Sequence, residues 1–562
     1  MGEGRFILRS IVILVLSLFS FVVCDDFTPH EDSCFQKSCF KVARVCNLDN
    51  KTFTSNDNAF GKTFFSFRPQ DSNSASKILT LLDQRKSFNL TLTYQSSFNE
   101  GKQASWFMFN GSSCMTVGIP GDSAKEDVNG SQLGLSLGNM GADLRPGKIG
   151  EICVKPKVNN YIFNLDYNFN LDAVVCGLWG RAALPIVRAE TDLRVCATGK
   201  GIATDKFSKG LFSLDCKETD VPYTRIDDAF EGDKGFGEIP PLNYSKFAQR
   251  KLIKTGLAGI HLNLGYDICR DWRTYVGLGL NVVVPTGNRP TGEYLFEPVV
   301  GANHCWQLGG LLECYKNWYC NDTKTGVYFY GTVNHLFKAR QTRTFALKKN
   351  GAGSQFLLLK KFNPTVTGLD GADRVANILS GEAKIGAAVM VDASVMLQIA
   401  YRKLFFNLGY NLWFRTKEKT NDSICFSGFQ DNRFGIKGNL NLSQIGDSCP
   451  YPNDPPCNAL LSTASKSTIG VPADEDPSEP NGDPIPKLLS CKNDIDVSAP
   501  LHPSAISNKI FATLGVNLYN ESCNYNEFYN KAYILLSVEV EFGRNSSSIS
   551  QWSIVSKVGI EF

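Results

Sequence analysis

The chain has 562 residues, a formal net charge of +3, 43% apolar residues and 20% charged residues. Its charge is near neutral and its Lys and Arg residues are scattered, so the basic stripe of a nucleic-acid-binding protein is missing and no nucleic-acid partner is expected. Beyond the N-terminus, no run reaches the ~18 to 20 apolar residues of a membrane-spanning helix, which excludes a helical membrane protein but leaves a strand-based one open.

The first 24 residues have the layout of a secretory signal peptide. Two arginines and an apolar run over residues 11–23 precede a pair of aspartates. We expect residues 1–24 to be removed and the mature chain to begin near Asp25. Cys24 leaves a lipoprotein as the alternative, although Val23 is bulkier than that cleavage site prefers. The remaining cysteines, 17 of 18, fit an oxidising compartment.

From residue 88 onward, many segments alternate apolar and polar residues with a period of two, as β-strands do. The predicted strands are 88–95, 105–110, 158–170, 172–182, 184–194, 256–268, 272–285, 304–316, 324–337, 384–400, 402–417, 505–519, 528–542 and 550–562. Most exceed the 5 or 6 residues usual in soluble strands and reach the ~9 to 11 residues that a tilted membrane strand needs. They predict an all-β fold, an antiparallel up-and-down transmembrane barrel of about fourteen strands within a range of 12 to 16.

The connections between these strands alternate between short and long. Long loops are expected at 195–255, 286–303, 338–383 and 418–504, and the other joins are short. Outer-membrane barrels have short periplasmic turns and long extracellular loops, so this rhythm places both chain ends in the periplasm. A soluble sandwich is the alternative, but loops of 40 to 90 residues are hard to place in an ordinary soluble fold.

The chain ends on "WSIVSKVGIEF", in which Val558, Ile560 and Phe562 alternate with polar or small residues. With the signal peptide, the strands and the loop rhythm, this ending resembles the porin-like outer-membrane β-barrels of Gram-negative bacteria. The resemblance implies that Phe562, Ile560 and Val558 are an assembly signal, although Lys557 stands where that motif often has glycine.

The same resemblance implies a location in the bacterial outer membrane. Its lipid and the barrel assembly machinery would be partners, and a homo-oligomer is expected because trimers are common among such porins. Residues 86–562 would form the barrel. Residues 25–85 would be a periplasmic or plug-like segment.

Charged residues and one histidine on the polar faces are the candidates for lining the pore. They are His261, Asp267, Arg273, Glu313, Lys384, Asp392, Lys403, Arg415, Lys509, Lys531, Glu539 and Glu541. They either line a water-filled channel for small solutes or pair across the lumen and plug it. Because neither sign dominates, no ion selectivity is predicted.

Six cysteines lie in two of the long loops, where a disulfide removes much of the entropy of the unfolded chain. They are Cys196 and Cys216 in one loop and Cys425, Cys449, Cys457 and Cys491 in the other. Bridges within each loop are expected. Cross-links between neighbouring barrels are the alternative, and they suggest a second function, a structural or adhesive surface protein anchored by the barrel.

No motif for catalysis or metal binding is found. The chain lacks a Gly-x-Ser-x-Gly elbow and a His-Glu-x-x-His pair, so no enzyme, catalytic residue or cofactor is expected. The acidic segment 473–484 follows no calcium-loop template. Residues 282–301 contain Pro-Thr-Gly twice and predict an ordered outer loop that folds inward as a constriction, with a ligand site as the alternative.

Overall fold

The computed structural model describes sixteen stretches of the chain and three single residues. They are 68–70, 74–79, 86–99, 104, 113–117, 150–198, 206–207, 212–213, 218–271, 273–348, 350–351, 353–362, 364, 369–420, 426, 429–436, 488–518, 531–544 and 548–561. All of them belong to one compact unit, residues 56–562. Among these residues, no helix is long and apolar enough to span a membrane.

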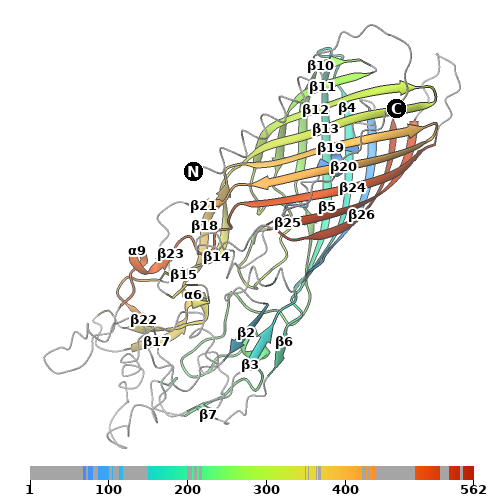
Figure 1. Ribbon diagram of the computed structural model, residues 1–562. Helices are drawn as coiled ribbons and strands as arrows, with labels where there is room; N and C mark the ends of the chain where they lie inside the picture. Colours follow the sequence, from blue (N-terminus) through green and yellow to red (C-terminus); the bar gives the residue numbers. More distant parts are fainter. Residues whose placement is uncertain are drawn as a thin grey trace, which may run out of the picture. The chain divides into compact units, whose positions relative to one another are not determined.

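In this part of the chain, twelve antiparallel strands close into a barrel (Figure 1). They are β1 (Ser87–Ser97), β4 (Lys157–Asn170), β5 (Leu178–Asp192), β10 (Ile260–Arg270), β11 (Thr274–Val284), β12 (Gln307–Cys320), β13 (Thr323–Leu336), β19 (Met390–Tyr401), β20 (Leu404–Arg415), β24 (Ala505–Asn517), β25 (Lys531–Arg544) and β26 (Gln551–Glu561). The short strand β9 (Leu252–Leu257) pairs with the C-terminal half of β5, whereas β10 pairs with the N-terminal half of β5. Strands β9 and β10 therefore act as one strand interrupted at residues 258–259.

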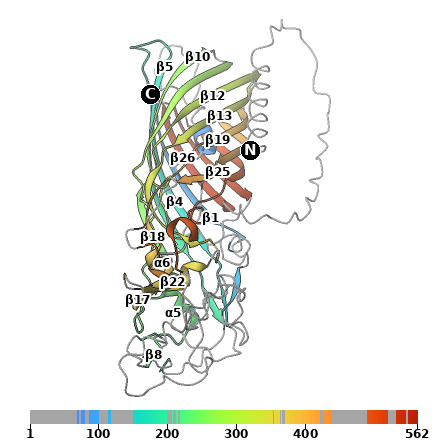
Figure 2. The ribbon, with the colours of Figure 1, turned by 90° about the vertical axis from the view of Figure 1, so that its left-hand side faces the viewer.

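The last strand closes the barrel by pairing with the first. Strand β26 runs antiparallel to β1 from Glu561 opposite Ser87 to Gln551 opposite Ser97, and β25 lies on its other side. Strand β1 pairs with β4 on its other side, and Figure 2 labels these strands in the barrel. Each of the twelve barrel strands is therefore hydrogen-bonded to a neighbour on both sides, which is the condition for a sheet to cross lipid.

The antiparallel barrel is confirmed, and its strand number lies at the lower end of the predicted range. The predicted strands 172–182 and 184–194 are one strand, β5, because residues 171–177 form the turn that precedes it. The exposed turn residues Val174 and Val175 are apolar, so alternation alone could not mark the turn. The predicted strand 105–110 lies outside the described residues.

The outer wall of the barrel is apolar and its inner wall is polar. On six strands, outward-facing residues are 42–60% exposed: Leu264, Leu280, Leu408, Ile510, Leu536 and Ile560. Their inward-facing neighbours, such as Asn263, Asn281 and Asn407, are buried. A soluble barrel would hide the apolar face, whereas a transmembrane barrel turns it to lipid. The chain is therefore built to span a membrane with its strands.

Aromatic rings on the inner wall occupy space next to glycines of a neighbouring strand. A Cβ atom at Gly409 of β20 would lie 2.1 Å from Cζ of Phe511 on β24, and one at Gly515 of β24 would lie 2.1 Å from Cζ of Phe405 on β20. No side chain fits at that distance, so these two glycines leave the space that the rings occupy.

The long connections fold into what we call the loop domain, formed by the described residues of 98–156, 193–251, 285–306, 337–389 and 416–504. Its strands are β2 (Cys114–Val117), β3 (Gly150–Cys153), β6 (Cys196–Thr198), β7 (Lys206–Phe207), β8 (Thr219–Asp220), β14 (Ala339–Thr344), β15 (Ala346–Leu347), β16 (Leu358–Phe362), β17 (Leu369–Arg374), β18 (Ser380–Ala387), β21 (Glu418–Thr420), β22 (Phe434–Ile436) and β23 (Ile495–Asp496). Its helices are α5 (Ile226–Glu231), η2 (Ser354–Phe356), α6 (Val375–Ile378) and α9 (Cys491–Asp494).

The loop domain has hydrophobic cores of its own. One core includes Phe230, Phe247 and Phe356, which come from two different connections, and a second includes Leu357 and Phe434. The described parts of the predicted loops are thus folded rather than merely long. The predicted strand 384–400 was wrong at its start, because β18 belongs to a separate sheet with β14 and β21.

Candidate functional site: the lumen of the barrel

A segment from before the first strand lies inside the barrel. The short helix α2 (Ser74–Lys77) lies against β13, β19 and β20. Ala75, Ile78 and Leu79 are 0–1% exposed. They belong to one cluster with side chains of the inner wall: Trp179, Tyr275, Leu311, Tyr328, Tyr330, Met396, Phe405, Phe511, Tyr533 and Leu535. We call residues 68–70 and 74–79 the lumen segment.

Arg68 joins the lumen segment to the barrel wall through charge. Its Nη2 lies 2.6 Å from both carboxylate oxygens of Asp392 on β19, and its Nη1 donates to Asn411 Oδ1 at 2.5 Å. The same Nη1 lies 3.6 Å from Glu541 Oε1 on β25. The Arg68 side chain is 5% exposed and both carboxylates are 2–3% exposed. The guanidinium group of arginine is planar, so its hydrogen bonds to carboxylates are directional as well as strong.

Lys509 supplies the second cation of this region. Its Nζ lies 2.7 Å from Glu539 Oε2 and 3.8 Å from Glu541 Oε2. Among these five groups, three carboxylates thus face two cations, and one of those cations comes from the lumen segment. Removing Arg68 would leave three carboxylates and one cation among these five buried groups, a costly arrangement.

A second buried ion pair lies elsewhere in the lumen. Arg181 on β5 contacts Glu313 on β12 at 2.7 Å, although β10 and β11 stand between these strands, and it also donates to Asn168 at 2.6 Å. Nearby polar contacts include Lys77 Nζ and His261 Nδ1, 3.2 Å apart, which again link the lumen segment to the wall.

Seven of the twelve predicted pore-lining residues are buried on the inner wall. They are His261, Asp267, Glu313, Asp392, Lys509, Glu539 and Glu541. An eighth, Arg415, is buried at the loop end of β20, where it lies 3.7 Å from Glu418. In this structure several lumen charges are paired, among them Arg181 with Glu313 and Lys509 with Glu539. Neutral inward side chains such as Asn407 and Thr513 are also buried. Side chains of the wall and of the lumen segment therefore share the lumen.

Three of the predicted pore-lining residues are not in the lumen. Arg273 and Lys403 are exposed in the turns that precede β11 and β20, because alternation continues past the strand ends. Lys384 is exposed on β18, in the loop domain, since the barrel strand begins only at Met390. The side chain of Lys531 lies outside the described residues.

Two lumen residues were missed in the sequence. Arg181 occupies an inward position of a predicted strand, so its alternation with apolar neighbours was a usable signal. Arg68 lies in a segment without alternation, and only the tertiary contact with Asp392 identifies it.

The loop domain meets the barrel at a buried charge cluster that we call the junction. Glu418 lies 3.5 Å from Arg343 and accepts a hydrogen bond from the backbone N of His502 at 3.0 Å. Burial lowers the pKa of Arg343 to about 10, against the opposing effect of Glu418. Burial also raises the pKa of the neighbouring Cys305 thiol to about 12, so it stays protonated and unreactive at neutral pH.

The loop 282–301 packs against the lumen segment. Gln70 donates from Nε2 to the Val299 carbonyl and accepts at Oε1 from the Gly301 backbone N, each at 3.0 Å. Val300 is 1% exposed and belongs to a cluster with Ile162 and Val187 of the barrel strands. The end of this loop is therefore ordered and contacts the inner wall.

Two of the three predicted assembly residues lie on the last strand, β26. Val558 and Ile560 face outward, 37% and 42% exposed, and Phe562 lies outside the described residues.

Among the predicted disulfide cysteines, Cys196 has a free thiol, and the disulfide in this region joins Cys114 and Cys153 instead. Cys491 begins α9, whereas Cys216, Cys425, Cys449 and Cys457 are outside the described residues, so their pairing stays a prediction.

Comparison with known proteins finds similarity to solved structures alone. No protein-family model matches the chain, and no curated protein sequence matches it. An outer-membrane channel from Pseudomonas putida F1 is 8% identical over 85% of this chain and 96% of that chain, with a TM-score of 0.34. The beta domain of the Bordetella autotransporter Brka is 8% identical over 85% and 100%, with a TM-score of 0.27. The Ralstonia pickettii toluene transporter TbuX is 8% identical over 90% and 97%, with a TM-score of 0.25.

Proposed function

We propose that this protein is an outer-membrane channel of a Gram-negative bacterium, that its lumen admits small solutes, and that the lumen segment closes it in the present state. Outer-membrane lipid covers the apolar wall, and the assembly machinery binds the C-terminal strand. The observation that carries the proposal is the Arg68 contact with Asp392 and Glu541. Arg68 comes from outside the barrel sheet, and its positive charge lies beside two carboxylates of the barrel wall.

The polarity of the lumen supports a channel over a solid anchor. Replacing a buried ion pair by well-packed apolar residues is often neutral or stabilising. A barrel that serves only as an anchor gains nothing from Asp392, Glu539 and Glu541 in its interior. Once the lumen segment leaves, those carboxylates would face water, which is the environment that a solute pathway needs.

Conductance of the refolded protein in planar bilayers tests this function. We expect wild type to be mostly closed with rare openings, and Arg68→Ala to raise the open probability by about tenfold or more, because the variant leaves buried carboxylates unpaired. Arg402→Ala removes an exposed arginine from a turn and should behave as wild type. Silent bilayers for both wild type and Arg68→Ala would sink the channel proposal.

A structural or adhesive role on the cell surface is the second candidate. It is favoured by the loop domain, which has its own cores and carries the exposed thiol of Cys196. Disulfide-linked oligomers on non-reducing gels of whole envelopes would support it. Strictly monomeric migration would contradict a disulfide-tied surface layer.

A further inference from the structure

Three cysteines lie in register on one small sheet of the loop domain. Strands β2, β3 and β6 pair antiparallel in that order, with Cys114 opposite Cys153 and Cys153 opposite Cys196. Directly opposite residues of neighbouring strands project from the same face, with Cβ atoms ~4.5 to 5.5 Å apart. Cys153 therefore lies between the other two cysteines, within reach of both.

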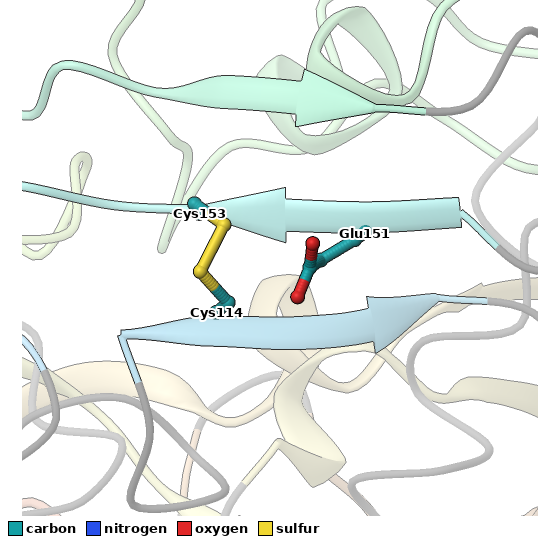
Figure 3. A group of neighbouring side chains, drawn as sticks. All are labelled: Cys114, Glu151 and Cys153. Carbon is teal, nitrogen blue, oxygen red and sulfur yellow. A yellow bond between two sulfur atoms is a disulfide. The ribbon is translucent and has the colours of Figure 1, made fainter.

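The middle cysteine is bonded to one neighbour and not to the other. Figure 3 shows the disulfide between Cys114 and Cys153, with Glu151 beside it. Cys196 has an exposed free thiol. A carboxylate oxygen of Glu151 lies within 4.8 Å of both bonded sulfur atoms. Because both of these sulfurs are oxidised, they are poor metal ligands, and the chemistry open to the group is exchange at sulfur.

We propose that Cys114, Cys153 and Cys196 form an intramolecular thiol–disulfide exchange site. The Cys196 thiolate attacks Cys153 Sγ, a bond forms between Cys153 and Cys196, and the bond between Cys153 and Cys114 breaks. Cys114 leaves as a thiolate and takes a proton from water. The number of disulfides is unchanged, so the step needs no oxidant or reductant.

The register also favours the direction of attack. The three residues form a row across the strands, so Cys196 approaches Cys153 from the side opposite to Cys114, as displacement at sulfur requires. Glu151 opposes the step, because its charge lies beside the Cys114 thiolate that would be released. The exchange moves the free thiol between β6 and β2, so each state presents a different cysteine to a thiol or disulfide of another protein.

Disulfide mapping of the refolded full chain tests this site. Cys114, Cys153 and Cys196 fall in three different tryptic peptides, 103–125, 149–157 and 195–200. In a glutathione redox buffer, we expect acid-quenched wild type to contain both the 114–153 and the 153–196 linked peptides. Cys114→Ser should form the 153–196 bond, and Cys196→Ser should contain the 114–153 bond alone.

Two further variants sharpen the test. Glu151→Gln should speed the exchange about two- to fourfold at low ionic strength, since the repelling charge is gone. Cys176→Ser, which removes an exposed free thiol from the turn before β5, should match wild type. The proposal is overturned if folded Cys114→Ser keeps Cys153 and Cys196 as thiols, or if Cys196 in wild type is found bonded to Cys216 alone.

Discussion

Single buried charges decide how the loop domain is attached to the barrel. At the junction, Glu418 is 3% exposed and is the carboxylate that faces both Arg343 and Arg415. It also accepts from the His502 backbone, so it joins three parts of the chain. When one partner of a buried ion pair is removed, the other charge remains without compensation, which costs about 3–5 kcal/mol.

We therefore predict that Glu418→Gln lowers the free energy of unfolding by about 3 kcal/mol. The urea midpoint, followed by the fluorescence of the buried Trp413, should fall accordingly. Lys419→Gln changes an exposed residue next in sequence and should leave the midpoint unchanged. An unchanged midpoint for Glu418→Gln would show that the junction does not depend on this charge.

A second prediction concerns pH. Burial raises the pKa of Glu297 above its ordinary value of 4.5, although Thr291 and Gly292 donate hydrogen bonds to its carboxylate. The folded state therefore binds this proton more tightly than the unfolded chain, so the stabilisation is full below pH 4.5 and is lost as pH rises through the folded pKa.

Glu297→Gln keeps an oxygen for the backbone donors but does not ionise. From pH 4 to pH 7, the variant should lose less stability than wild type, measured as urea midpoints at both values. Equal losses in the two proteins would contradict the pKa shift as its cause.

At the scale of strands, ring and glycine pairs fix how neighbouring strands fit on the inner wall. Gly409→Val would place a side chain where the Phe511 ring lies. We expect a loss of about 1–3 kcal/mol, the usual cost of overpacking. The measurement is the fraction of protein that migrates as the folded, heat-modifiable band on gels.

Two variants separate overpacking from a general effect of losing glycine. Gly310→Ala places a methyl group where nothing lies within 4 Å, and it should fold as wild type. The double variant Gly409→Val with Phe511→Ala should regain folded protein, because the ring is gone. If Gly409→Val alone folds fully, the barrel does not need a glycine at this position to accommodate the Phe511 ring.

At the scale of the whole molecule, the seam between β26 and β1 completes the barrel. Along β26, outward Val558 and Ile560 alternate with buried Lys557 and Glu561. One residue inserted after Ser556 would turn Lys557 toward lipid, at a cost of ~2–4 kcal/mol near the membrane centre. We predict poor assembly of this variant in the membrane fraction.

A two-residue insertion at the same place is the matched control, since it restores the parity and should assemble better. Deletion of Phe562 tests the assembly signal separately, and we expect it to lower the membrane-inserted yield. Equal yields for the one- and two-residue insertions would contradict a seam that depends on parity.

The sequence by itself determined the membrane-spanning barrel and most of its inner face. Alternation with a period of two is a local property, so it identifies strands such as β19 and β20 and assigns Asp392 and Glu539 to the lumen. A predicted barrel also requires its last strand to pair with its first, because a sheet in lipid cannot keep an open edge, and β26 pairs with β1.

Only the tertiary structure decided which segment enters the lumen and how the long connections fold. Arg68 meets Asp392 across 324 residues of sequence, and no local pattern records such a contact. The cores of the loop domain combine residues from several connections, and the pairing of Cys114 with Cys153 depends on the register of two short strands. These features arise from contacts between distant segments, whereas strand patterning arises within each segment.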